Sequence, residues 1–240
     1  MGADDRYRLT ADAWLGDILG RRAWLVAPQG ATPMSELRKP GLQFATAKVD
    51  AADTGAAAAL QVSGFRVVDT ALTLEAESPA PGKISAGVRF ARPQDRSAVE
   101  AIAASAFRYS RFHLDPQIPK PLADKVKVAW AGNWFNGQRG DGMVVAEDGG
   151  EVAGFLLLIW AGDARLVIDL IAVRAQSERK GLARAMIGFA QANGTGDARQ
   201  PAGMVVGTQA ANVPSVRLYE SLGFRLRQAK FVLHHHGAAA

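Results

Sequence analysis

After residue 83, strand-like apolar runs alternate with helical apolar stripes. Short alternating or continuous apolar runs predict strands, and apolar residues spaced three and four apart predict helices. We expect strands at 88–90, 143–147, 152–160, 165–173, 204–208 and 225–234, and helices from Pro93 to 106 and over 122–135, 181–191 and 213–222. The dense Leu, Val and Ile content of 165–173 predicts a strand that is buried on both faces. Asp148-Gly149-Gly150 predicts a hairpin turn.

A stretch rich in proline and glycine divides the chain. Residues 78–82 hold two prolines and one glycine, which is typical of a linker. We therefore expect a front domain over 1–82 and a back domain over 83–240. The alternation of elements in the back part predicts an α/β fold with a mixed central sheet flanked by helices.

The front part contains a weak copy of a back segment. Residues 53–65 and 212–224 have the same spacing, with Asp or Asn at the start and Gly-Phe at the end, and each lies between two strand-like stretches. The front copy has Leu60 where the back copy has Tyr219. We interpret the front copy as a partial β-α-β unit without the chemistry of the back copy, with a chance match as the alternative.

Composition narrows the function classes. The chain has no cysteine, which excludes disulfides, zinc–thiolate sites and thiol nucleophiles and fits a reducing cytoplasm. The first ten residues do not resemble a signal peptide, and the apolar run 155–161 is too short to span a bilayer. A net charge of +5 favours anionic partners. Because the basic residues are scattered, we expect no nucleic-acid partner. The short apolar run predicts no membrane insertion, and the lack of cysteine favours a cytoplasmic location.

The segment 173–183 leads from an apolar strand into a helix. Gly181 and Ala183 leave room for a close backbone approach. The first turn of a helix has unpaired N–H groups and the positive end of the dipole, which together favour a pyrophosphate. Arg179, Lys180 and Arg184 add positive charge there. An ordinary strand-to-helix turn with solvated charges is the alternative.

A second segment, 212–224, predicts a helix capped by Asn212. Ser215 and Tyr219 are four residues apart and share a helix face with Asn212. A tyrosine hydroxyl on that face can protonate a leaving thiolate. A tyrosine that packs in the core with a satisfied hydroxyl is the alternative.

Together the two segments resemble the signature of the GNAT superfamily of N-acetyltransferases, over about 86–234. In that family a Q/R-x-x-G-x-G/A loop holds the CoA pyrophosphate, and 178–183 stands in its place. A later N-x-x-[SA]-x-x-x-Y-x-x-x-G-F helix supplies a CoA contact and the general acid, and 212–224 matches it. The resemblance implies a GNAT fold preceded by a smaller, truncated GNAT-like domain, with acetyl-CoA as co-substrate and Tyr219 as the catalytic acid.

The resemblance also implies a set of acyl-CoA contacts from the strand end, the loop and the second helix. They are Ile171, Ala172, Val173, Glu178, Arg179, Lys180, Gly181, Leu182, Ala183, Arg184, Asn212 and Ser215. Glu178 departs from the family's Gln or Arg. Since a carboxylate beside a pyrophosphate is unfavourable, only the backbone N–H role is carried over to Glu178.

Within the superfamily, the chain resembles the WecD-type acetyltransferases, which act on a dTDP-4-amino-4,6-dideoxy sugar (dTDP-fucosamine). The resemblance rests on 110–116, on 206–212 and on the truncated front part. It implies a primary amine on a nucleotide-linked sugar as the acceptor. The acceptor-side candidates are Arg111, Phe112, His113, Asp115, Trp134 and Asp169, with helix packing as the alternative for Trp134 and a structural carboxylate for Asp169.

The implied mechanism is direct attack of a neutral amine on the thioester, with Tyr219 protonating the thiolate. Asp169, His113 or a chain of ordered water remain open as the general base. No metal is expected, because adjacent histidines at 234–236 alternate faces on a strand, and we interpret them as a surface strand end or a tag remnant. A homodimer is expected. A protein, peptide or antibiotic amine as acceptor, and a non-catalytic acyl-CoA-binding module, stay open as alternatives.

Overall fold

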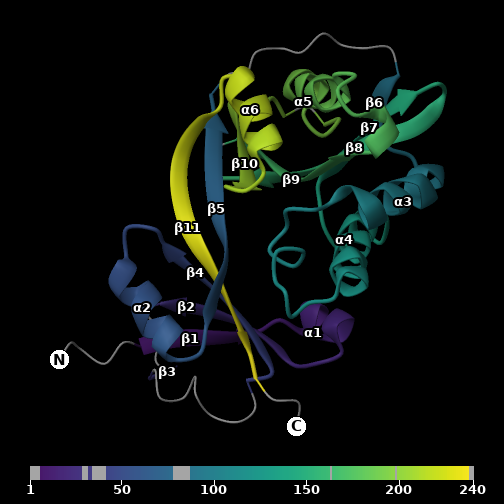
Figure 1. Cartoon of the computed structure of the whole chain (residues 1–240). Coiled ribbons are helices and arrows are strands. Elements are labelled where there is room, and N and C mark those ends of the chain that lie inside the picture. Colours follow the sequence, from purple (N-terminus) through teal and green to yellow (C-terminus); the bar gives the residue numbers. More distant parts are fainter. Residues whose placement is uncertain are drawn as a thin grey trace.

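The computed structural model describes residues 6–28, 32–33, 42–77, 87–162, 164–197 and 199–237. The predicted linker at 78–82 lies outside these residues, so the domain boundary between 82 and 83 stays a prediction. The described strands form one sheet in the order β3-β1-β2-β4-β11-β5-β10-β9-β8-β7-β6 (Figure 1). They are β1 (Arg6–Ala11), β2 (Ala23–Pro28), β3 (Thr32–Pro33), β4 (Phe44–Asp50), β5 (Arg66–Ala76), β6 (Val88–Phe90), β7 (Gly142–Asp148), β8 (Glu151–Ala161), β9 (Arg165–Val173), β10 (Gly203–Gln209) and β11 (Arg225–His236).

The sheet is mixed. Among the described strands β2 pairs with β4, and β9 with β10, in parallel, while the remaining neighbours are antiparallel. The β7–β8 connection is the predicted hairpin, and Gly149 and Gly150 adopt φ of 67° and 83°, which a two-residue hairpin turn of this kind needs. The structure thus has the expected α/β class.

Helices cover both faces of the back half of the sheet. The described helices of the chain are α1 (Ala13–Leu19), α2 (Thr54–Val62), α3 (Arg96–Ala106), α4 (Lys120–Phe135), α5 (Leu182–Asn193) and α6 (Val213–Ser221), with 3-10 turns at Pro93–Asp95 and Ala175–Ser177, and α1 and α2 belong to the front part. In Figure 1, α5 lies on one side of β8 and β9, and α3 and α4 lie on the other. Each side has its own apolar core, as the alternation of the strands requires. None of the described helices is long and apolar enough to cross a membrane.

The suspected internal repeat is present in the structure. An offset of 159 residues, the separation of Asp53 and Asn212, places β4 on β10, α2 on α6 and the start of β5 on the start of β11. Asp53 and Asn212 both cap their helices by accepting a backbone N–H three residues later. At the helix ends, Gly64 and Gly223 both adopt a φ near 90°. The predicted β-α-β unit in the front part is therefore confirmed.

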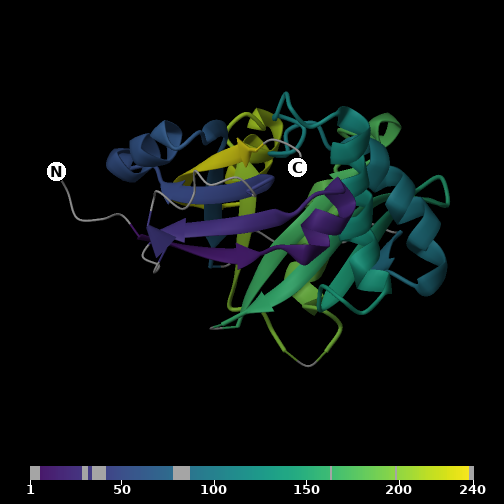
Figure 2. The same cartoon turned by 90° about the horizontal axis from the view of Figure 1, so that it is seen from below.

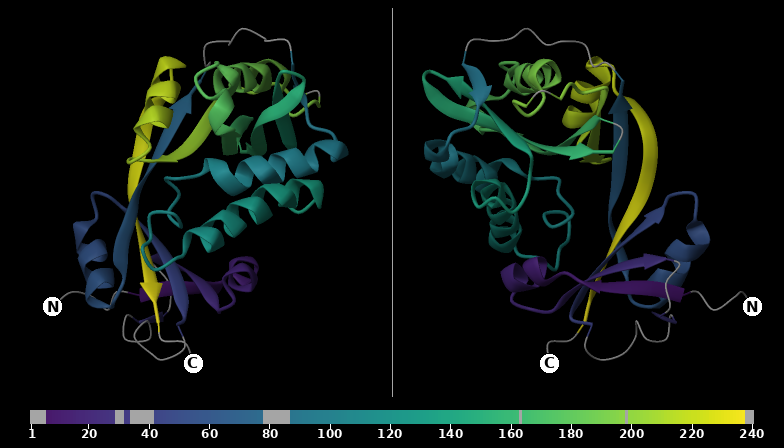
Figure 3. Two further views of the ribbon diagram at one scale, coloured as in Figure 1. Left: turned by 45° about the vertical axis from the view of Figure 1, so that its right-hand side comes forward. Right: turned by 180° about the vertical axis from the view of Figure 1, so that it is seen from behind.

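The two copies of the repeat exchange strands. β11 lies between β4 and β5, and β5 lies between β11 and β10, as the long strands in Figures 1 and 3 show. The register obeys the same offset, because Val206 pairs with Leu74 and the equivalent Ala47 pairs with Leu233. A local pseudo-two-fold axis passes between β5 and β11, so neither copy has a complete sheet without the other.

The copies differ where chemistry is expected. Leu60 is fully buried in the front core, and its counterpart Tyr219 is also buried but lines a cavity. The connection from β9 to β10 holds α5, whereas the described part of the connection from β2 to β4 holds only the short strand β3. The front copy thus shows no helix N-terminus, among its described residues, at the place where the back copy has one.

Helix α1 joins the front part to the back part. Its buried Leu15 and Leu19 pack in one apolar cluster with Phe44 of β4 and with Ala123 and Val126 of α4. Figure 2 shows α1 beside α4. This contact closes one side of the space between the two parts, where two of the cavities described below are found.

Candidate active site

The parallel strands β9 and β10 separate halfway along their length. They pair only over Arg165–Ile168 and Gly203–Val206. Asp169 lies in a β-bulge, because Ile168 and Leu170 face consecutive residues of β8. Beyond the bulge, the edge of β9 that faces β10 is unpaired and borders a cleft. As predicted, both faces of β9 are covered, because Leu166 and Ile168 belong to one apolar core and Leu170 and Ala172 to the other. The half-buried Val167, Asp169 and Ile171 border the cleft.

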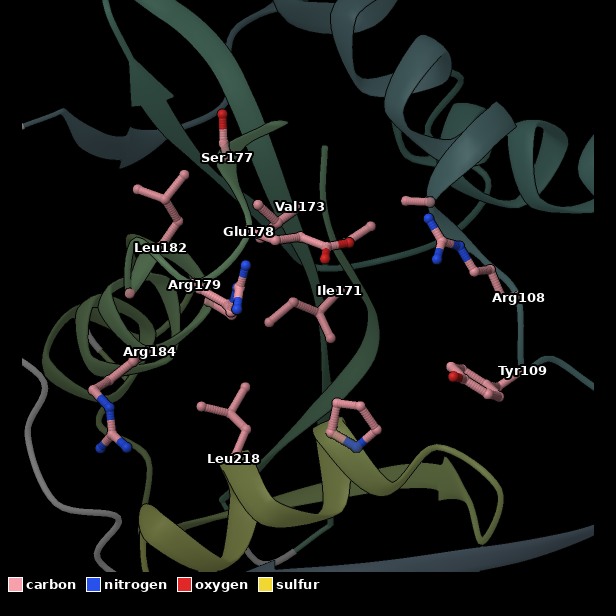
Figure 4. Close-up of a pocket in the computed structure, with 15 residues that line it drawn as sticks. Arg108, Tyr109, Ile171, Val173, Ser177, Glu178, Arg179, Leu182, Arg184 and Leu218 are labelled. Atoms are coloured by element: carbon pink, nitrogen blue, oxygen red, sulfur yellow. The ribbon is translucent and has the colours of Figure 1, made fainter. Parts of the chain in front are cut away.

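A cavity of about 510 Å³, here called the loop cavity, lies at the open end of this cleft. It is framed by β9, the 177–184 loop and helix start, α6 and the segment after α3 (Figure 4). Of the predicted acyl-CoA contacts, it brings together Ile171, Ala172, Val173, Glu178, Arg179, Gly181, Leu182, Ala183 and Arg184. Lys180, Asn212 and Ser215 do not line it.

The three exceptions have other contacts. Lys180 Nζ lies 2.6 Å from the Asp148 carboxylate at the β7–β8 hairpin. The Asn212 side chain accepts the Ser215 N–H at 3.3 Å, which makes it the cap of α6. Pro214 and Leu218 of the same helix line the cavity instead, as do Ala106, Arg108, Tyr109 and Ser177, which the sequence analysis did not identify. The four-residue spacing of Pro214 and Leu218 could have indicated this helix face.

The start of α5 presents unpaired donors to the loop cavity. The first helical bond runs from Ala185 N–H to the Gly181 carbonyl, so the N–H groups of Leu182 to Arg184 precede it. Arg179 has a φ of 61° and Gly181 a φ of 82°, both left-handed, and this turns the chain sharply into the helix. Arg184 donates to Ser221 Oγ at 2.6 Å and ties α5 to α6. Unpaired N–H groups beside arginines form an anion site.

Tyr219 lies in the narrow part of the cleft. It is 2% exposed, and it lines a second cavity of about 360 Å³, the strand cavity, bordered by β5, β9 and β10. Its hydroxyl has no hydrogen-bond partner among the described residues. Burial raises the pKa of Tyr219 above the usual value of about 10, so the phenol is neutral and keeps its proton.

The Acetyltransferase (GNAT) family model matches residues 100–224, a segment that contains the splayed strands, the loop and the Tyr219 helix. This match covers more than half of the chain. The chain belongs to the GNAT family of acetyltransferases. As in that family, an acyl-CoA donor is expected to meet a nucleophile in the cleft.

Known proteins extend the comparison. The spore coat polysaccharide biosynthesis protein SpsD of Bacillus subtilis (strain 168) is 31% identical over 142 residues, which are 59% of this chain and 48% of SpsD. The chain thus spans about half the length of this curated relative. A GCN5-related N-acetyltransferase from Kribbella flavida has a TM-score of 0.59 at 16% identity, over 98% of this chain and 91% of its own. A functionally unknown conserved protein from Staphylococcus epidermidis reaches 0.66 at 12% identity, over 99% and 94%. At these identities the two structures show the fold alone.

The strand cavity of this GNAT chain holds a polar cluster opposite Tyr219. Asp169 accepts two hydrogen bonds from Arg139, at 2.6 and 2.7 Å, and a third from Trp130 Nε1 at 2.8 Å. The carboxylate is thereby held in place by a bidentate arginine. Lys127 of α4 also lines this cavity and is almost fully buried.

A third cavity of about 710 Å³, the inter-half cavity, lies between the front and back parts of the GNAT chain. It shares Lys48, Trp130 and Arg139 with the strand cavity, so the two adjoin. Arg111 lines it beside Lys48, and neither makes a hydrogen bond or ion pair with the described residues. Burial lowers the pKa of Arg111 only to about 10, so its guanidinium is charged at neutral pH.

Of the acceptor-side candidates, Arg111 lines the inter-half cavity and Asp169 lines the strand cavity. Phe112 is 1% exposed and packs in the core formed with α1 and α4. His113 is held by Ser110 Oγ at 2.6 Å and Asp124 at 2.9 Å. Trp134 packs edge-on against Phe135. None of these side chains, nor Asp115, lines the strand cavity or the inter-half cavity. The 110–115 segment turns Phe112, His113 and Asp115 inward, and Trp134 of α4 packs against the core between α3, α4 and the sheet.

The expectation of a surface strand end at the histidines is wrong. β11 continues to His236, and His234 is 1% exposed. His234 and His236 share one face, and each has a ring nitrogen 2.7 Å from the same Asp115 oxygen. His235 lies on the other face against Phe65, as strand alternation requires. The ligand-type atoms of Asp115, His234 and His236 lie within 4.8 Å of one another.

Proposed function

We propose that the chain is an acetyl-CoA-dependent N-acetyltransferase that acetylates the 4-amino group of a nucleotide-linked dideoxy sugar. The observation that carries this proposal is the series of adjoining cavities, from the unpaired donors at α5, past Tyr219, to the unpartnered cations Lys48 and Arg111. SpsD, the relative named above, is a polysaccharide biosynthesis protein, which supports a sugar acceptor.

The donor fits the first part of this series. A pyrophosphate at Leu182–Arg184 is met by three backbone N–H groups and by the helix dipole. The pantetheine arm then runs along the unpaired edge of β9, where free backbone N–H groups can polarise the thioester carbonyl. The amine attacks this carbonyl, a C–N bond forms, the C–S bond breaks, and Tyr219 gives its proton to the thiolate. Holding both reactants in one cleft contributes up to roughly 7–11 kcal/mol in favourable cases.

The acceptor fits the last part. Lys48 comes from β4 of the front part and Arg111 from the segment before α4, and together they present two unpartnered cations to one cavity. The Arg111 guanidinium lies over the Phe112 ring but makes no hydrogen bond or ion pair with the described residues, so its N–H groups are free to bind a phosphate in bidentate fashion. Trp14 and Trp130, whose rings lie 6.0 Å apart edge to face, provide an aromatic wall for a sugar or a base. In a nucleotide-linked sugar a diphosphate lies between the base and the sugar. Cations for the diphosphate and aromatic rings for the base or the sugar are both present in this cavity.

The direct test is a panel of amines with acetyl-CoA, followed by thiol release. We expect turnover with dTDP-4-amino-4,6-dideoxyhexoses. If the enzyme acetylates a peptide, protein or antibiotic amine and none of these sugars, the proposed acetyltransferase activity stands and the proposed sugar acceptor is refuted. CoA binding without thiol release on any amine would indicate the non-catalytic alternative.

Gly181→Val is expected to weaken CoA binding by about tenfold or more, which is ~1.4 kcal/mol. A Cβ at Gly181 meets no protein atom within 4 Å, so the added side chain occupies the space where we place the pyrophosphate. Calorimetry with CoA measures the change. Because φ is +82° at Gly181, Gly20→Val is the matched control: Gly20 has a left-handed φ of +66° and open space too, but lies in the front part. Equal CoA affinities for the two folded variants would contradict the placement.

Arg111→Met is expected to raise KM for the nucleotide sugar by roughly 10- to 100-fold, the range for losing a hydrogen bond to a charged group of about 1.5–3 kcal/mol. KM for a free amino sugar without phosphate should change little, because it lacks the anion. Steady-state kinetics with both acceptors separates the two cases. Arg217→Met, an exposed arginine of α6, is the control. An equal rise in KM for the nucleotide sugar and for the free amino sugar would argue against a contact between Arg111 and phosphate.

A further inference from the structure

Lys127 is a buried lysine inside the candidate active site. It lies in the middle of α4, is 7% exposed and lines the strand cavity together with Tyr219 and Asp169. Its Nζ atom lies 4.8 Å from the ring centroid of Phe107 and 4.6 Å from that of Trp130. No carboxylate of the described residues lies within salt-bridge distance of Nζ. A buried lysine without an acidic partner is rare, because a buried ammonium loses its hydration.

Burial outweighs the other influences on this amine. Two aromatic faces stabilise an ammonium, but full burial disfavours the charged form of a lysine more strongly. Burial, and secondly the charge of Arg111, lower the pKa of Lys127 to about 7, while Asp169 opposes this shift. Asp169 is already engaged by Arg139. Near neutral pH, a large fraction of Lys127 is therefore the free amine.

The other charged groups around the strand cavity are poorly placed to accept a proton. Arg139 after α4 is engaged by Asp169, and Arg111 before α4 lines only the inter-half cavity. Burial lowers the pKa of Lys48 and raises that of Asp69 to about 6, but these two groups attract each other, and Asp69 does not line the strand cavity. Asp169 accepts three hydrogen bonds, as described above. Burial lowers the pKa of His113, but its ring nitrogens are occupied by Ser110 and Asp124 and it does not line the cavity.

We propose that Lys127 is the general base that takes the proton from the ammonium group of the acceptor. This inference rests on the proposed acetyltransferase function and adds a residue to it. The ammonium gives one proton to the Lys127 amine, and the resulting neutral amine attacks the thioester carbonyl. The C–S bond breaks, and Tyr219 protonates the thiolate. The amide nitrogen returns a proton to Tyr219, and Lys127 releases its proton to solvent, so one proton is produced per turnover.

The test compares Lys127→Met with Lys127→Arg. Methionine has a similar length without a titrating group, and arginine keeps a cation that never becomes a base. For the wild type, kcat/KM should rise with pH through about 7, where Lys127 loses its proton. In both variants kcat/KM should fall by about 10²-fold or more at neutral pH. The pH at which kcat/KM rises should move toward the pKa of the acceptor's own ammonium group. KM for acetyl-CoA should not change. Lys125→Met, an exposed lysine of the same helix, is the matched control.

A second readout is independent of turnover. The chain has eight lysines, so the Nζ titration of Lys127 can be followed by NMR with lysine labelled at Cε and assigned from its absence in Lys127→Met. Lys127 is supported as the general base if its Nζ titrates near 7 and the rise of kcat/KM near pH 7 is absent in both variants. Titration near 10, a fully active Lys127→Arg or an unchanged pH profile in Lys127→Met overturns it. A folded wild type that binds CoA but acetylates no amine refutes the proposed function itself, and the base with it.

Discussion

Replacing Tyr219 by Phe is expected to lower kcat by about 10²–10⁴, with little change in CoA binding. The variant keeps the ring, which packs beside Phe224 at 5.6 Å between centroids, and deletes only the hydroxyl. Because that hydroxyl has no protein partner among the described residues, its removal leaves no donor or acceptor unpaired. The loss should therefore report on proton transfer to the thiolate rather than on stability.

Tyr7→Phe is the matched control, because Tyr7 is a buried tyrosine of the front core and lines none of the three cavities. We expect near wild-type kcat for this variant. Rates from single-turnover experiments distinguish a chemical step from product release. Wild-type turnover by Tyr219→Phe would remove Tyr219 from the mechanism, whatever the acceptor.

The second large effect is a loss of stability in mild acid. Burial lowers the pKa of His234 to about 4, from an ordinary value of 6.5, with the hydrogen bond to Asp115 opposing the shift. Burial alone would raise the pKa of Asp115, but hydrogen bonds from His234, His236 and the Gln117 N–H outweigh it and hold that pKa far below the usual range. The native state thus contains an ionised carboxylate that accepts a bond from a neutral His234.

Both shifts have the same sign for stability. Since the folded pKa of His234 is depressed, the unfolded chain binds more protons between about pH 6.5 and 4. The contribution of His234 to stability is complete above pH 6.5 and is lost as the pH falls, by on the order of 3 kcal/mol at pH 4, and Asp115 adds to the loss below its unfolded pKa. Burial raises the pKa of Asp69 to about 6, and this acts in the opposite direction between about pH 6 and 4, so the comparison with a His234 variant isolates the His234 contribution. Urea unfolding at several pH values between 4 and 8 measures the slope.

His234→Gln should flatten this slope, because the titrating group is gone. Part of the slope should remain, since burial also lowers the pKa of His235 and of His113. A variant that keeps the full acid dependence of the wild type would contradict the assignment to His234.

The regular elements could be predicted because their patterns are local. The apolar run 165–173 coincides with β9, and the Gly-Gly turn at 149–150 defines the β7–β8 hairpin. The 53–65 copy was recognisable because capping and turn residues are required at fixed spacing. The bulge at Asp169 has no such local signature. It arises from the register with β8, which depends on residues twelve positions earlier in the chain.

The candidate site was harder to predict where it depends on packing between distant segments. Lys48 and Arg111 belong to different halves and meet only through the exchanged strands. Lys127 was not identified from the sequence, because it lies close to Lys120 and the exposed Lys125 in the same helix. The helical spacing nonetheless places Lys127 on the same face as Ala123 and Ala131, which are four residues away on either side. Both alanines are fully buried, so this face of the helix points inward.

The exchange of β5 and β11 also constrains the order of folding. Phe44 at the start of β4 pairs with His236 at the end of β11, so this ladder joins residues 192 positions apart in the chain (236 − 44). During synthesis β4 and β5 emerge early, but the position between them is filled only when β11 leaves the ribosome. Contacts of such high sequence separation slow folding and leave strand edges exposed meanwhile. We therefore expect the nascent front part to depend on chaperones until the last strand arrives, and its refolding rate to respond more to changes in β11 than to changes in α5.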